Sequence, residues 1–233
     1  MPTEPAGIGA WLPALLQTAD ALFPTGAYAH SLGLEEMAGL GAVRNEETLG
    51  EFLTGHLLPN LRNQELPYLR FLVEAGDDLG EFCALDREIH SWKLARETRE
   101  ASIQIGTRRL KALRAISTAP LLLEFETAIS RNEAFGHHLS ACAVQAITEG
   151  IPMEGALGTY AYQTLAGACA AALKLIRIGQ DGCQRALRLG LSRLPEVLEE
   201  SLLVERDRAG CFSPLLEIAS MRHAFAHERL FIS

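Results

Sequence analysis

The sequence lacks paired cysteines and a basic leader. None of its five cysteines forms a Cys-x-x-Cys pair, which argues against both a zinc knuckle and a disulfide framework. No lysine or arginine precedes Arg44, so the positively charged start of a secretory signal is missing, although the stretch from Trp11 to Leu16 is apolar. Both absences favour the reducing cytosol, and we expect a cytoplasmic location.

An extended basic region is also missing. The formal net charge is −8, and the pI is near 5.4. Basic residues gather in one short cluster, which consists of Arg108, Arg109, Lys111 and Arg114. A nucleic-acid binder needs many such charges to neutralise phosphates, so we expect no nucleic-acid partner.

Alternating strand patterns are absent, and helical patterns take their place. Asn45 is a suitable N-cap, and the apolar residues at 49, 52, 53 and 57 share one helical face. A second helix is predicted from about Ala95 to Ile116. Inside it Gly106 indicates a close contact, because a mid-helix glycine costs about 1 kcal/mol relative to alanine. Five prolines suit the first turns of helices, namely Pro67, Pro120, Pro152, Pro195 and Pro214.

These patterns predict an all-α fold. With 48% hydrophobic residues the chain can bury a substantial core. Typical helix lengths then give about nine to eleven helices. Neither an internal repeat nor a long linker divides the sequence. We therefore expect one helical domain over residues 1–233, with flexible segments at about 1–10 and 224–233.

One uncharged stretch, from Gly155 to Leu173, is long enough to span a membrane at about 19 residues. Alanine and glycine dominate it, and polar residues such as Thr159 and Gln163 interrupt it. Insertion scales disfavour that composition in a bilayer. We interpret the stretch as a central helix whose small residues let its neighbours approach closely, and we expect no membrane association.

Motifs for enzyme chemistry are weak. Neither a GxxxxGK[ST] phosphate loop nor a GxGxxG turn is present, so the chain is not expected to bind a nucleotide by itself. The run AHSLG around Ser31 approximates the hydrolase elbow G-x-S-x-G, but that elbow needs a strand entering a helix. Pro24 and Gly26 instead suggest a turn before a helix start. We therefore expect that the protein is not an enzyme. The alternative is a small helical serine hydrolase that uses Ser31.

Histidine and acidic clusters give signals that are equally weak. His223 and His227 lie four residues apart and share a helical face that could hold nickel, zinc or copper, although Ala224 replaces the glutamate of an HExxH peptidase. The other interpretation is a polar contact surface. His137 and His138 point to different sides of a helix. The set from Asp86 to His90 has the pattern of an ordinary charged helix surface.

Four segments of the sequence stand out, namely FPTGAYAHSLGLE, LARETREASIQIGTRRL, HH followed by LGTYAYQTLAGACAAALKLIRIGQ, and SMRHAFAHERLFIS. Taken in this order, they resemble the urease accessory protein UreF family. The resemblance extends from about Leu15 to Ser233. It implies an α-helical, typically dimeric scaffold without substrate turnover. With UreD/UreH and the GTPase UreG, such a scaffold matures apo-urease by GTP-dependent nickel insertion. Nickel and GTP would be handled by the assembled complex, and no cofactor would be bound by this chain itself.

The resemblance also assigns residues. The expected partner-binding residues are Pro24, Gly26, Tyr28, Ser31, Gly33, Glu35, Arg222, His223, Arg229, Leu230 and Phe231. Tyr28 is the first choice among them, since an aromatic ring with a hydroxyl is a favoured interface anchor. The central motif is expected to make packing or dimer contacts through Arg96, Glu97, Arg99, Ser102, Gln104 and Gly106.

The C-terminal segment departs from the family pattern. Ala224 stands where a glutamate is usual, His227 and Glu228 replace a Tyr-Ser pair, and Ile232 replaces a common arginine. These departures leave a metal role for His223 and His227 open, and with it the alternative of a nickel-carrying protein.

Overall fold

The structure of the protein is a computed structural model. It describes residues 9, 11–20, 22–26, 31–211, 213–223 and 230–231. The segments expected to be flexible, 1–10 and 224–233, lie almost entirely outside these residues.

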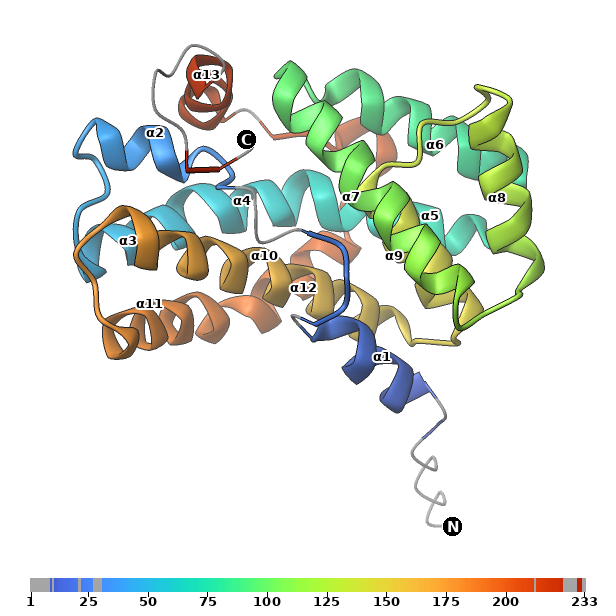
Figure 1. The fold of residues 1–233 in the computed structure, drawn as a ribbon, viewed down its shortest axis with the longest axis horizontal. Helices are drawn as coiled ribbons and strands as arrows, with labels where there is room; N and C mark the ends of the chain where they lie inside the picture. Colours follow the sequence, from blue (N-terminus) through green and yellow to red (C-terminus); the bar gives the residue numbers. More distant parts are fainter. Residues whose placement is uncertain are drawn as a thin grey trace.

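The described residues form helices and no strand, which confirms the all-α prediction (Figure 1). The helical segments are α1 (Trp11–Ala19), α2 (Leu34–Gly39), α3 (Glu46–Phe52), η2 (Leu53–Leu57), α4 (Leu58–Asn60), η3 (Leu61–Glu65), α5 (Leu66–Ala75), α6 (Leu79–Trp92), α7 (Arg96–Arg114), α8 (Pro120–Ser130), α9 (His138–Thr148), α10 (Met153–Leu175), α11 (Gln180–Ser192), α12 (Leu194–Leu202), η4 (Arg206–Arg208) and α13 (Pro214–His223). Because α3, α4 and α5 belong to one continuous helix, the number agrees with the nine to eleven expected.

That continuous helix, from α3 to α5, begins as predicted and contains two prolines. Asn45 caps it, because its Oδ1 accepts a hydrogen bond from the Thr48 N–H at 3.0 Å. The wider π-helical turns η2 and η3 precede Pro59 and Pro67, which have no N–H to donate. The Asn63 carbonyl, four residues before Pro67, instead accepts from Gly210 N at 2.8 Å. Pro67 lies in the first turn of the α-helical segment α5, as predicted, although η3 makes this segment continuous with the helix before it.

Helix α10 is the centre of the molecule, and it contains the uncharged stretch of the sequence (Figure 1). It contacts α1, α2, α5, α9, α11 and α12. Its buried residues are mostly small, among them Ala161, Ala168 and Ala172, which have no exposed surface. Small side chains let several helices approach one axis, so the interpretation as a central helix is confirmed. Among the described residues no helix is long and apolar enough to cross a membrane.

The first and last helices of the described chain lie on different sides of the molecule. Helix α13 lies above α2 at one edge of the molecule, and it also contacts α7 (Figure 1). Helix α1 lies on the opposite side, against α10. The α2–α13 region therefore brings the two terminal motifs of the sequence together.

Candidate functional site: the surface of α2 and α13

Helices α2 and α13 approach closely at Gly33. This residue precedes α2 with a φ of 81°, a left-handed conformation that favours glycine. A Cβ atom at this position would lie 3.4 Å from the Cβ of Ala219 and 3.6 Å from the Leu216 carbonyl oxygen. Glycine thus supplies the left-handed turn before α2, and the short distances show that α13 packs against this turn.

Glu35 anchors the far end of the chain to α2. Its carboxylate accepts hydrogen bonds from the backbone N–H of Leu230 at 2.7 Å and of Phe231 at 3.3 Å. The Phe231 ring is buried, and the Lys174 ammonium lies 5.4 Å from the ring centroid. Next to this anchor, Glu36 and Arg222 form an ion pair at 2.7 Å. Residues almost 200 positions apart in the sequence therefore meet on one small surface.

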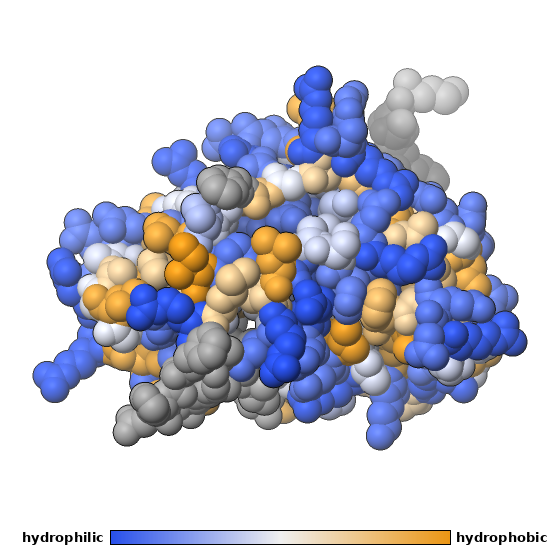
Figure 2. Space-filling view, turned by 90° about the horizontal axis from the view of Figure 1, so that it is seen from above, coloured by the Kyte–Doolittle hydropathy of each residue, from blue (hydrophilic) through white to orange (hydrophobic). Residues whose placement is uncertain are grey.

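Exposed apolar side chains extend this surface along α13. Leu215, Ile218 and Met221 are 55%, 51% and 43% exposed. Their spacing of three residues places them on one side of the helix. Figure 2 looks down on the side of the molecule that carries α13 and shows apolar patches between hydrophilic side chains. We call Leu215, Ile218, Met221 and the exposed Leu230 the α13 face.

The remaining predicted partner-binding residues have different environments. Pro24 is exposed, whereas a Cβ on Gly26 would lie 2.4 Å from an Arg108 guanidinium nitrogen. Ser31 is completely buried, so a substrate has no access to its hydroxyl in this structure and the hydrolase alternative gains no support. His223 is the last residue of α13. Tyr28, His227 and Arg229 lie outside the described residues, and the described ones contain no group of three or more metal-binding side chains.

We expect Glu35→Gln to loosen the C-terminal anchor without unfolding the protein. A hydrogen bond to a charged acceptor contributes about 1.5–3 kcal/mol, and 1.4 kcal/mol corresponds to a factor of ten. Exchange of the Leu230 and Phe231 amide hydrogens should therefore accelerate about tenfold or more. Glu36→Gln is the matched control. It removes the ion pair with Arg222 but leaves the hydrogen bonds from the Leu230 and Phe231 N–H groups to Glu35. Equal exchange in wild type and Glu35→Gln would contradict the anchor.

Behind the α13 face lies a cavity of about 80 Å³, with polar and apolar lining residues, that sequence reasoning missed. Lys93 is 8% exposed there, with its ammonium 3.4 Å from a Glu65 carboxylate oxygen and 4.6 Å from the Trp92 ring centroid. Glu217 of α13 also lines the cavity, and burial raises the pKa of its carboxyl. The three charged residues come from three different helical regions, so no single motif indicates them.

The central motif divides between exterior and interior. Arg96 is exposed and pairs with Glu100, and Gln104 is also exposed. Arg99 donates to the Lys93 carbonyl at 2.9 Å, and Glu97 is half-buried. Ser102 and Gly106 face inward, toward the segment that precedes α9. A Cβ on Gly106 would lie 2.1 Å from the Gly136 carbonyl oxygen, so the predicted close contact at Gly106 is confirmed.

Asp86 organises that same segment, and the interpretation of its neighbourhood as an ordinary charged surface was wrong. The residue has no exposed surface. Its carboxylate accepts from the backbone N–H of Phe135, Gly136 and His137 at 2.6, 3.1 and 3.0 Å and from the Ser140 hydroxyl at 2.6 Å. One side chain of α6 therefore holds the turn that begins α9.

His137 is buried in the adjoining hydrogen-bonded chain. Its Nδ1 lies 3.1 Å from the Ser102 hydroxyl and its Nε2 lies 3.2 Å from the His90 Nδ1. Burial, followed by the charges of Lys93, His90 and Arg99, lowers the pKa of His137 to about 3. The imidazole is thus neutral at physiological pH, and it links α6, α7 and α9.

This histidine makes stability depend on pH. The pKa in the folded state lies below the ordinary value of about 6.5, so protonation favours the unfolded chain. The contribution of neutral His137 to the free energy of unfolding is complete above about pH 6.5 and is lost as the pH falls toward 3. Between pH 7 and pH 5 the loss is about 2 kcal/mol. Urea unfolding at both pH values should show a smaller loss in His137→Gln than in wild type. Equal losses would contradict this assignment, and His56→Gln, a half-exposed histidine, is the control.

The fold and the surface define an all-α protein whose two terminal motifs build one partly apolar face. Residues 43–189 match the family model UreF. The chain is 33% identical over 228 residues to a protein of Arthrobacter sp. (strain FB24) named urease accessory protein UreF, covering 98% of this chain and 100% of the relative. A relative of the same name from Paenarthrobacter aurescens (strain TC1) is 35% identical over 220 residues, with 94% and 97% covered. The chain therefore belongs to the UreF family of urease accessory proteins.

Proposed function

We propose that this protein is a scaffold for urease maturation. It would assemble with UreD/UreH, the GTPase UreG and apo-urease, and it would support GTP-dependent insertion of nickel into the urease active site. Nickel and GTP would be bound by the assembled complex, in which the nucleotide chemistry belongs to UreG. The scaffold itself would carry out no turnover, and it would work in the cytoplasm as a homodimer.

The observation that carries the proposal is the meeting of the two terminal motifs on α2 and α13. Glu35 connects α2 to Leu230 and Phe231, and Gly33, directly before α2, lies against Ala219 and Leu216 of α13. Beside this junction three large apolar side chains of the α13 face are exposed on one side of α13. Isolated exposed apolar residues are ordinary, whereas an aligned group beside charged and anchored residues is typical of a protein interface. We assign the UreD/UreH contact to this face.

The assignment is tested by co-expressing the tagged protein with UreD/UreH and UreG, followed by affinity capture and sizing. Leu215→Asp combined with Ile218→Asp places charge on the α13 face, and we expect capture of UreD/UreH to fall at least about tenfold, as at a binding hot spot. Leu203→Asp is the matched control, because Leu203 is 81% exposed at the end of α12. Tyr28→Ala and a chain ending before Arg229 test the residues outside the described structure.

The outcomes separate the surface from the family function. A ternary complex that forms with Leu203→Asp and weakens with the α13 double variant supports the assignment. Equal capture by both variants moves the UreD/UreH contact elsewhere on the molecule. Failure of folded wild type to capture either partner would overturn the proposed scaffold function itself.

A further inference from the structure

A buried arginine on α7 lacks a counter-charge. Arg109 is only 3% exposed, although its neighbours Arg108 and Lys111 are exposed. Transfer of a charge into a protein interior is unfavourable by several kcal/mol unless opposite charge or good hydrogen bonds compensate it. Buried arginines are therefore normally found beside carboxylates.

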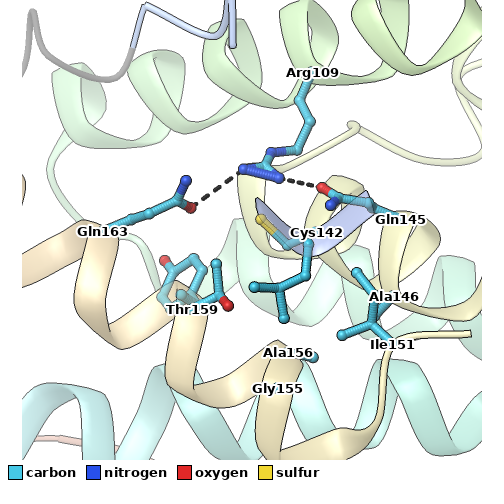
Figure 3. Close-up of a pocket in the computed structure, with 11 residues that line it drawn as sticks. Arg109, Cys142, Gln145, Ala146, Ile151, Gly155, Ala156, Thr159 and Gln163 are labelled. Carbon is cyan, nitrogen blue, oxygen red and sulfur yellow. Dashed lines mark hydrogen bonds between the residues drawn. The ribbon is translucent and has the colours of Figure 1, made fainter. Parts of the chain in front are cut away.

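The partners of Arg109 are neutral. Its Nη1 donates to the Gln145 side-chain oxygen, and its Nη2 donates to the Gln163 side-chain oxygen at 3.2 Å (Figure 3). Its Nε is buried and has no hydrogen-bond partner among the residues that the structure describes. The Phe23 ring centroid lies 5.5 Å from the guanidinium carbon. Within the described part of the chain no ion pair connects Arg109 to a carboxylate.

The side-chain amides of Gln145 and Gln163 are held in one orientation by hydrogen bonds of their own. The Gln145 amide nitrogen donates to the Thr18 hydroxyl, and the Gln163 amide nitrogen donates to the Thr18 carbonyl at 3.1 Å and to the Ala19 carbonyl at 3.2 Å. Their oxygens are thereby held toward the guanidinium. The arrangement fixes the position of the positive charge between α1, α7, α9 and α10.

A small cavity adjoins this charge (Figure 3). Its volume is about 20 Å³, which is room for about one water-sized particle. Among the described residues that line the cavity, Arg109 is the only one of charged type. Burial raises the pKa values of the Cys142 thiol and the Tyr160 hydroxyl, so both stay neutral. Leu15, Ala146 and Ile151 contribute apolar wall that limits the size of any occupant.

We propose that this cavity binds one small monovalent anion of the halide class against the Arg109 guanidinium. The anion supplies the missing negative charge, and the cavity dimensions suit a monatomic ion rather than a phosphate or a larger carboxylate. Hydroxyl and thiol hydrogens of Thr159 and Cys142 line the same space and can orient toward it. Because four helices meet here, the bound ion would hold α1 onto the body of the protein.

Bromide is the probe. Thermal unfolding of the full chain is followed from 10 mM to 1 M sodium bromide, with sodium sulfate, whose anion is too large for the cavity, added to keep ionic strength constant. Binding to the folded state should raise the midpoint by about 5 °C over this range. Weakly hydrated bromide would otherwise stabilise less than sulfate, so the expected sign is opposite to the general salt effect. Crystals grown in bromide should show an anomalous peak beside Arg109.

The variants isolate the site. Arg109→Gln should abolish the rise with bromide, whereas Lys111→Gln, which removes an exposed charge from the same helix, should keep it. Should Arg109→Gln fail to fold, the anomalous peak and the bromide response of wild type still decide the matter. A midpoint that does not rise with bromide, together with no peak in the cavity, overturns the proposal in favour of a bound water. A rise that persists in Arg109→Gln overturns it as well.

Discussion

Asp86→Ala should lower the free energy of unfolding by about 4 kcal/mol or more. The substitution removes an acceptor that is fully buried and receives four hydrogen bonds. Each bond to a charged acceptor contributes about 1.5–3 kcal/mol, and a buried N–H left without a partner adds a similar penalty. Urea unfolding followed by circular dichroism measures the change, and the midpoint of thermal unfolding should fall by about 10 °C.

Asp78, the carboxylate that caps the start of α6, provides the control for Asp86, which lies in the middle of the same helix. Asp78 caps this helix by accepting from the Glu81 N–H at 3.1 Å, and it is exposed. Asp78→Ala should therefore lower stability by only about 1 kcal/mol. The ratio between the two variants distinguishes an organising buried carboxylate from an ordinary cap. Similar small effects for both would show that the turn before α9 holds its conformation without Asp86.

Sequence patterns were sufficient for the helices but not for Asp86. The N-cap at Asn45 and the uncharged central helix depend on neighbouring residues and periodicity, which are local properties. Asp86 stands next to Arg87 and Glu88, a local pattern typical of a solvated face. Its burial arises from a turn about 50 residues later in the chain, which helical periodicity does not reveal.

The burial of Arg109, in contrast, could have been predicted from helical periodicity. This residue was grouped with Arg108, Lys111 and Arg114 as a basic cluster, yet on α7 it continues the buried line of Ser102 and Gly106. Positions three and four residues apart share a helical face, so the inward direction of Arg109 follows from the spacing. What the spacing does not provide is the neutral surroundings, since Gln145 and Gln163 come from two other helices.

The meeting of the terminal motifs is likewise a tertiary result. Both motifs were expected to bind partners because of their resemblance to a family, without any indication that they touch. The Glu35 carboxylate joins them through backbone N–H groups of Leu230 and Phe231. Backbone donors carry no sequence signature, so this contact is visible only in the folded chain.

Gly106→Ala should lower the free energy of unfolding by about 3 kcal/mol, although alanine is the better helix former. The new Cβ would lie 2.1 Å from the Gly136 carbonyl oxygen and 2.8 Å from the His137 carbonyl oxygen. Both contacts are to backbone, so α7 and the turn before α9 have to move apart, and overpacking of this kind costs about 1–3 kcal/mol or more. Urea unfolding measures the loss.

The same substitution elsewhere should have the opposite sign. Gly167 lies inside α10, and a Cβ there meets no atom within 4 Å. Gly167→Ala should therefore raise the free energy of unfolding by about 0.5–1 kcal/mol through helix propensity alone. Stabilisation by both variants would contradict the close contact at Gly106. The two substitutions should differ in sign because hydrogen bonds of His137 and Asp86 hold the turn before α9 in place. The turn cannot move away from the new methyl group at position 106 without breaking these bonds.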